Sequence, residues 1–206
     1  MIDLLVLVAD SNMKGLMEGL LSRFHTVEGI PAFTFTIVAH PQQDSGVRKQ
    51  AMDFVRPNLN THKFLLVMLD HEGSGFDKTA TDLQNTLQKE LVKNGWKDRV
   101  CAVAFEPECD VWLWVNRNKM QELFKPMNNG TPIVDIDAWL TARNYQLNDA
   151  NKPLRPKEAI EAYLEALKIQ RSSSQYKKLA ASASYKECVD PAFVRVRQAL
   201  LSWFKA

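Results

Sequence analysis

Four acidic residues follow strongly apolar segments of the chain at short distances. These residues are Asp10, Asp70, Glu72 and Asp110. Carboxylates gathered in one small volume repel one another unless a cation lies between them. Hard divalent ions such as Mg²⁺ prefer oxygen ligands, and one or two carboxylates with water and phosphate oxygens complete their coordination. The residue types therefore predict a metal-binding cluster, provided that the fold brings the four acids together.

The Asp70-x-Glu72 spacing adds to this prediction. In extended backbone, alternate side chains point the same way, so both carboxylates would face one side. Gly73 and Gly75 follow, and the lack of a side chain lets the backbone approach a phosphate group closely. A single Asp after a strand is often only a helix cap. The hypothesis therefore depends on the acids acting together.

The elements that must position these acids are read from hydrophobic spacing. Four segments rich in apolar and β-branched residues predict strands at 2–9, 33–39, 63–69 and 99–105. Helical spacing predicts helices between and after them at 13–24, 47–55, 79–93 and 111–124. This alternation favours an α/β fold with a mostly parallel sheet and flanking helices. Ligands of such sheets bind beyond the carboxyl ends of the strands, which is where the acids fall.

The strand pattern ends after Lys125. A loop containing Asn128-Asn129-Gly130 follows, and the remaining periodic segments are helical, at 135–143, 156–168, 173–184 and 191–204. We therefore expect an α/β domain over 1–125 and a helical C-terminal region over 126–206 packed on it.

Charge and composition limit the class of protein. Residues 151–206 carry a net charge of +6 and residues 1–150 a net charge of −4. A basic region beside an acidic domain favours nucleic acid as a partner, although solvated helix faces also carry such charges. Three cysteines without paired spacing indicate reduced thiols. With no signal peptide and no membrane-length apolar run, we expect a cytoplasmic protein without a membrane partner.

The order of the motifs resembles the TOPRIM superfamily, and within it the small OLD/RloB-like proteins of bacterial phage-defence systems. The motifs are Val6-Leu7-Val8-Ala9-Asp10 with Gly15 and Leu20-Leu21, Val67-Met68-Leu69-Asp70-His71-Glu72-Gly73, Pro107-Glu108-Cys109-Asp110-Val111-Trp112-Leu113, and the tail segments Arg155-Pro156-Lys157-Glu158-Ala159, Tyr176-Lys177 and Asp190-Pro191-Ala192-Phe193. The similarity spans nearly the whole chain and is greatest to a small component of methylation-associated defence systems.

The resemblance implies a nuclease-type protein that binds Mg²⁺ or Mn²⁺ and acts on phosphodiester bonds, with other defence-system subunits as partners. It implies that Asp70, Glu72 and Asp110 hold the metal together with Asp10. Asp10 would relay a proton, and Lys177 would neutralise phosphate charge. The family has Glu at the first position and usually Asp at the third, so Asp10 and Glu72 each displace a carboxylate by about an ångström, enough to cost about a hundredfold in rate.

Two other functions stay open at this point. The departures at Asp10 and Glu72 favour a non-catalytic nucleic-acid-binding or scaffold subunit of a defence complex. Receiver domains also place acids after the first and third strands, but they need an acid pair after the first, and Ser11 and Asn12 follow Asp10 here. No nucleophile–base spacing, zinc template or nucleotide-binding glycine motif is present. The sequence does not indicate whether the substrate would be DNA or RNA. It also does not indicate the oligomeric state.

Overall fold

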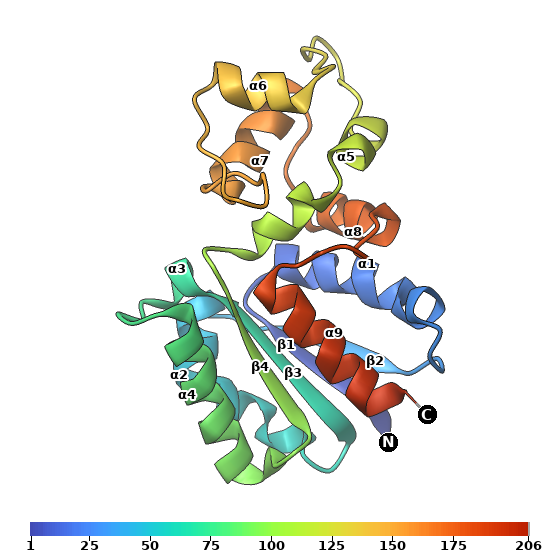
Figure 1. Cartoon of the computed structure of the whole chain (residues 1–206). Coiled ribbons are helices and arrows are strands. Elements are labelled where there is room, and N and C mark those ends of the chain that lie inside the picture. Colours follow the sequence, from blue (N-terminus) through green and yellow to red (C-terminus); the bar gives the residue numbers. More distant parts are fainter. Residues whose placement is uncertain (206) are drawn as a thin grey trace.

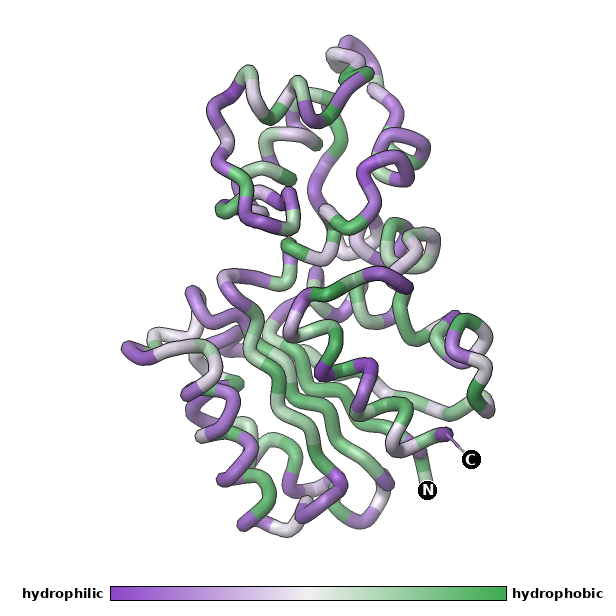
Figure 2. Tube along the Cα trace, viewed as in Figure 1, coloured by the Kyte–Doolittle hydropathy of each residue, from purple (hydrophilic) through white to green (hydrophobic). Residues whose placement is uncertain are grey.

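The computed structural model describes residues 1–205, and its centre is a four-stranded, all-parallel sheet (Figure 1). The strands are β1 (Ile2–Val8), β2 (Phe35–Ala39), β3 (His62–Asp70) and β4 (Val100–Phe105), in the order β2-β1-β3-β4. Residues 4–9 and 65–69 are almost completely buried, as expected of strands covered on both faces. Figure 2 shows the strands as the most continuous apolar part of the chain. The predicted α/β fold with a parallel sheet, flanking helices and a helical C-terminal region is confirmed.

Helices cover both faces of the sheet. The chain passes from β1 to β2 through α1 (Ser11–Glu28), and then turns back through α2 (Gln43–Val55) to β3 and through α4 (Ala80–Leu91) to β4. Because parallel crossovers are right-handed, this reversal puts α1 on one face and α2 with α4 on the other (Figure 1). The strand order reverses between β1 and β3, and such a switch point is where open α/β sheets bind ligands.

The last helix, α9 (Pro191–Phe204), covers the part of the sheet that α1 leaves open (Figure 1). The ring of Trp203 stacks on Phe64 of β3 at a centroid distance of 4.8 Å, and Phe204 stacks on Phe33 at 4.1 Å. Helix α9 therefore belongs to the helical layer that covers this face of the sheet. The domain boundary near residue 125 stays a prediction.

The outer edge of β4 is closed by side chains. Gln88 Nε2 donates to the carbonyl of Val100, and the Ala102 amide donates to Gln88 Oε1, at 2.9 and 2.8 Å. Arg195 Nε of α9 donates to the Ala102 carbonyl at 2.8 Å. These bonds satisfy an edge that would otherwise be open to pairing with another chain.

A second group of helices lies beyond the carboxyl end of the sheet (Figure 1). It contains the 3₁₀ segment η3 (Cys109–Val115), α5 (Arg117–Leu123), α6 (Ile136–Ala142) and α7 (Pro156–Ala166). The prediction of one helix over 111–124 is wrong, because the backbone of Asn116 is not helical and its side chain caps α5 by accepting a hydrogen bond from the Lys119 amide. Residues 109–114 are all buried, whereas a surface helix buries only one stripe, so apolar spacing misled the assignment.

Helix α8 (Ser173–Ser182) packs closely along α1. A Cβ atom at Gly15 would lie 2.2 Å from the carbonyl oxygen of Ser173, and one at Gly19 would lie 2.3 Å from that of Lys177. Only glycine at both positions permits this approach. The two contacts run in the same direction along both helices, so the N-terminus of α8 lies beside the N-terminus of α1, next to the carboxyl edge of the sheet.

The remaining short segments are η1 (Arg56–Asn58), α3 (His71–Ser74) and η2 (Val92–Trp96). No helix within residues 1–205 has the length and apolar character needed to cross a membrane.

Candidate metal centre

The parallel strands deliver acids to one edge of the sheet. Leu7 of β1 is paired with Val67 of β3, so Asp10 and Asp70 each lie three residues beyond aligned positions. Neighbouring strands are about 4.8 Å apart, which brings the ends of β1 and β3 close together. The sequence prediction that these two acids share one edge agrees with this register.

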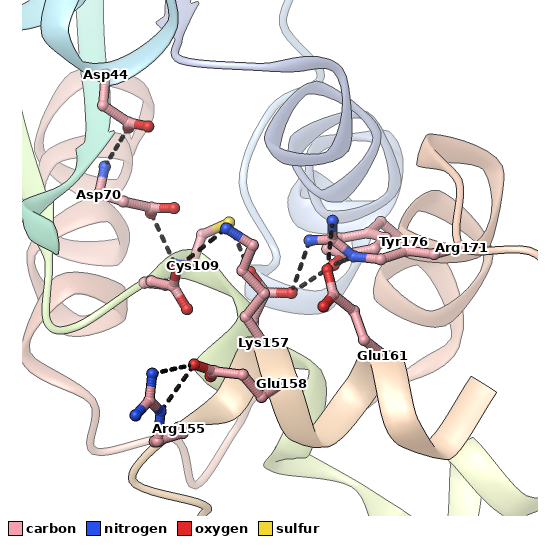
Figure 3. A network of polar contacts seen from close by, with 11 residues as sticks. Asp44, Asp70, Cys109, Arg155, Lys157, Glu158, Glu161, Arg171 and Tyr176 are labelled. Atoms are coloured by element: carbon pink, nitrogen blue, oxygen red, sulfur yellow. Dashed lines mark hydrogen bonds and ion pairs between the residues drawn. The ribbon is translucent and has the colours of Figure 1, made fainter. Parts of the chain in front are cut away.

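Asp44 is a further acid at this edge, and the sequence analysis missed it. It lies in the first turn of α2, which begins directly after β2, and its Oδ1 atom accepts a hydrogen bond from the Asp70 amide at 2.7 Å (Figure 3). The sequence predicts a strand that ends at residue 39 and a helix that begins only at residue 47, which leaves Asp44 in the connection between them. Asp44 could have been found because, like the other acids, it lies in the connection that leaves the carboxyl end of a strand.

Asp70, Cys109 and Asp110 form the group best placed to hold a metal ion. One potential ligand atom from each residue lies within 4.8 Å of the others. The Cys109 amide donates to Asp70 Oδ1 at 2.8 Å, which fixes the end of β3 against the start of η3 (Figure 3). Asp70 stays partly exposed, whereas Cys109 and Asp110 are buried.

Asp110 is held by two donors from the C-terminal region. The Tyr176 hydroxyl of α8 donates to Asp110 Oδ1, and Arg171 pairs with the same oxygen at 3.3 Å. Arg171 Nε also donates to the Tyr176 hydroxyl at 2.7 Å (Figure 3). Burial and the nearby Asp110 charge raise the pKa of Tyr176, so it stays a neutral donor at physiological pH. The charge of Asp110 is therefore compensated within the protein.

Asp44 and Asp70 lack such compensation. Within residues 1–205, no ion pair of 4.0 Å or less involves either carboxylate. Burial raises the pKa of Asp70 well above its usual value of 3.8, and the charge of Asp44 raises it further. Burial also raises the pKa values of Asp44 and Glu108. A cation at this edge would remove the repulsion and favour the ionised carboxylates.

Cys109 adds sulfur to the group, but in a form poorly suited to bind metal. Burial raises the pKa of its thiol well above 9.0, and the charges of Asp70 and Asp110 raise it further. A thiol must lose its proton to become a ligand. At neutral pH the available ligand atoms are therefore carboxylate oxygens, which suit Mg²⁺ or Mn²⁺.

Asp10 and Glu72 lie outside the group of three. Asp10 Oδ1 accepts a hydrogen bond from the Met13 amide at 2.8 Å, so the side chain caps α1. Its charge still acts on Asp44 and Cys109, which places it near them. Glu72 is exposed and lies in the helical turn α3, so the alternation expected of extended backbone does not apply to it. Its charge acts on Glu108.

The basic residues divide between two locations. Lys177 Nζ pairs with Glu18 of α1 at 3.0 Å and is mostly exposed. Lys157, at the start of α7, pairs with Glu108 at 3.3 Å, and Arg155 pairs with Glu158. Lys157 and Arg171 are therefore the cations that contact the acidic edge, and Lys177 is engaged elsewhere.

Comparison of the chain with protein-family models, with curated proteins and with solved structures finds no match. The geometry of this edge is consequently the basis for assigning a function.

Proposed function

We propose that this protein is a Mg²⁺- or Mn²⁺-dependent nuclease of the TOPRIM type that acts on phosphodiester bonds of nucleic acid in a bacterial anti-phage defence system. The observation that carries the proposal is the pair Asp44 and Asp70, two hydrogen-bonded neighbours with raised pKa values and no cationic partner within residues 1–205. Neighbouring carboxylates that are partly buried and have no cationic partner repel each other, and perturbed carboxyl groups of this kind cluster at functional sites.

Asp70 and Asp44 would supply the charged oxygens that hold the ion, with Asp110 behind them. A bound divalent ion would polarise a phosphoryl oxygen and activate water. Asp10 keeps one carboxylate oxygen outside its capping bond and would relay a proton. Lys157 takes the role of phosphate neutralisation that the resemblance gave to Lys177, because its ammonium group lies at the acidic edge. The basic C-terminal region would hold the nucleic acid backbone.

Cleavage of plasmid DNA, single-stranded DNA and RNA in the presence of Mg²⁺ or Mn²⁺ tests the proposal. We expect the wild-type protein to cleave one of these substrates and the Asp70→Ala variant to lose at least about a hundredfold in rate, as expected when a metal-binding or positioning group is removed. Lys177→Met should keep wild-type activity. Equal inactivity of wild type and Asp70→Ala on every substrate would contradict catalysis.

A second candidate is a non-catalytic nucleic-acid-binding or scaffold subunit of a defence complex. Two observations favour it: the Oδ1 atom of Asp110 is bonded to Arg171 and Tyr176, and Asp10 caps α1. Both acids thereby have structural roles that need no metal. Calorimetry separates the candidates, because tight Mg²⁺ or Mn²⁺ binding that is lost in Asp70→Ala counts against a purely structural role.

A further inference from the structure

Lys152 is a buried lysine without an anionic partner. Its exposed fraction is 8%, and within residues 1–205 its ammonium group takes part in no ion pair of 4.0 Å or less. Lysines are almost never this buried unless they are paired. The side chain is largely enclosed and its ammonium group has no acid of the protein to pair with, so it can take an anion that enters from solution.

The loop that carries Lys152 is held in place by its own backbone. The Lys152 amide donates to Asn148 Oδ1 at 2.9 Å, and the Asn148 amide donates to the Lys152 carbonyl at 2.8 Å. Arg117 of α5 donates to the carbonyl of Asn151. These bonds fix the loop against α5 and thereby hold Lys152 in its enclosed position.

Lys152 lines a cavity of about 530 Å³ between three segments of the chain. Its lining residues include Trp114, Val115 and Asn116 at the end of η3, and Ser184, Lys186 and Glu187 in the loop before α9. The cavity volume lies within the range of about 300–1,000 Å³ that small-molecule sites occupy. The cavity is lined by two lysines, Lys152 and Lys186, and by one acid, Glu187, so its net positive charge favours an anion.

We propose that this cavity binds the phosphoryl group of a small phosphate monoester. Lysine acts as a point charge for phosphate, and Asn116 and Ser184 add a neutral amide and a hydroxyl as hydrogen-bond donors. Trp114 and Val115 provide an apolar wall for the organic part of the ligand. The site is formed by other residues than the acidic edge, so it stands whether or not the protein cleaves nucleic acid.

The test compares thermal unfolding with and without inorganic phosphate and ribose 5-phosphate, at constant ionic strength, for wild type and Lys152→Met. Both ligands should raise the unfolding temperature of the wild type, and Lys152→Met should weaken their binding at least about tenfold, as expected for loss of a charged hydrogen bond. Without ligand, Lys152→Met should be about as stable as the wild type, because the substitution breaks no ion pair and keeps the apolar length of the side chain.

Lys89→Met, at an exposed position on α4, is the matched control and should bind phosphate as the wild type does. Acetate at the same ionic strength should have little effect. The proposal is overturned if phosphate fails to stabilise the wild type at millimolar concentration, if Lys152→Met binds phosphate equally well, or if acetate binds as tightly as phosphate.

Discussion

Replacing Arg171 with methionine is expected to lower the free energy of unfolding by about 3–5 kcal/mol, the usual cost of removing one partner of a buried ion pair. Asp110 is 2% exposed, and Arg171 is its only ion-pair partner within residues 1–205. Arg171 also bonds to Tyr176, which ties α8 to η3. The loss should appear in urea unfolding and as a drop in unfolding temperature of about 6 °C or more for a chain of this size.

Lys177→Met is the matched control for this prediction. It also removes one cation of the C-terminal region that pairs with an acid, but the pair with Glu18 is exposed and should contribute about 1 kcal/mol or less. In an Asp110→Asn background, Arg171→Met should cost clearly less than it does alone, because no buried charge is left without a partner. Equal costs in both backgrounds would show that Arg171 acts by packing alone.

Asp70→Asn is expected to stabilise the metal-free protein at about pH 7, because it removes a carboxylate charge that burial and the charge of Asp44 disfavour. The folded protein raises the pKa of Asp70 above 3.8 through burial and the charge of Asp44. Between 3.8 and the raised value the folded state binds more protons than the unfolded state, so the free energy of unfolding falls as pH rises. Asparagine removes this loss and can still accept the hydrogen bond from the Cys109 amide.

Urea unfolding with a chelator present, at about pH 7 and about pH 4, measures this effect. The gain from Asp70→Asn should be largest at the higher pH and much smaller at the lower one, where the folded protein holds Asp70 protonated and the unfolded carboxyl is close to its midpoint of 3.8. Asp98→Asn, at an exposed position, should change stability little at either pH. A variant less stable than the wild type at about pH 7 would show that the Asp70 charge is compensated.

The sheet could be predicted from the sequence because its strands carry a simple signal. Segments buried on both faces, such as 2–9 and 63–69, are nearly uninterrupted apolar runs, and their alternation with helices implies parallel order. The position of Asp10 and Asp70 at one edge followed from that order alone. The segment 111–124 could not be predicted in this way, because burial of every residue from 109 to 114 removes the periodicity that marks a helix.

The hydrogen-bond and ion-pair partners of the site residues could not be predicted from the sequence, because they depend on packing between segments far apart in the chain. Arg171 and Tyr176 reach Asp110 only because Gly15 and Gly19 let α8 lie against α1. The same packing directs Lys177 to Glu18. The sequence around Lys177 does not indicate this ion pair, and the phosphate-neutralising role that the resemblance implies for Lys177 stays a prediction.

The members of the candidate metal-binding group were predicted in part. Asp70 and Asp110 belong to the group that the structure brings together. Glu72 does not, because it lies in a helical turn where extended backbone was expected. Asp44 was missed because α2 begins at Gln43, four residues earlier than the predicted helix, and this places Asp44 in the first turn of the helix beside the end of β3. Such boundaries are the least certain part of any assignment from periodicity.

Calorimetric titration of Mn²⁺ and Mg²⁺ into the wild-type, Asp70→Asn and Asp98→Asn proteins at about pH 7 tests the central claim most directly. If the metal site exists, the wild type and Asp98→Asn should bind the ion, and Asp70→Asn should bind neither metal. Indistinguishable titrations of wild type and Asp70→Asn, or no binding to the wild type at millimolar metal, would contradict a metal centre at this edge.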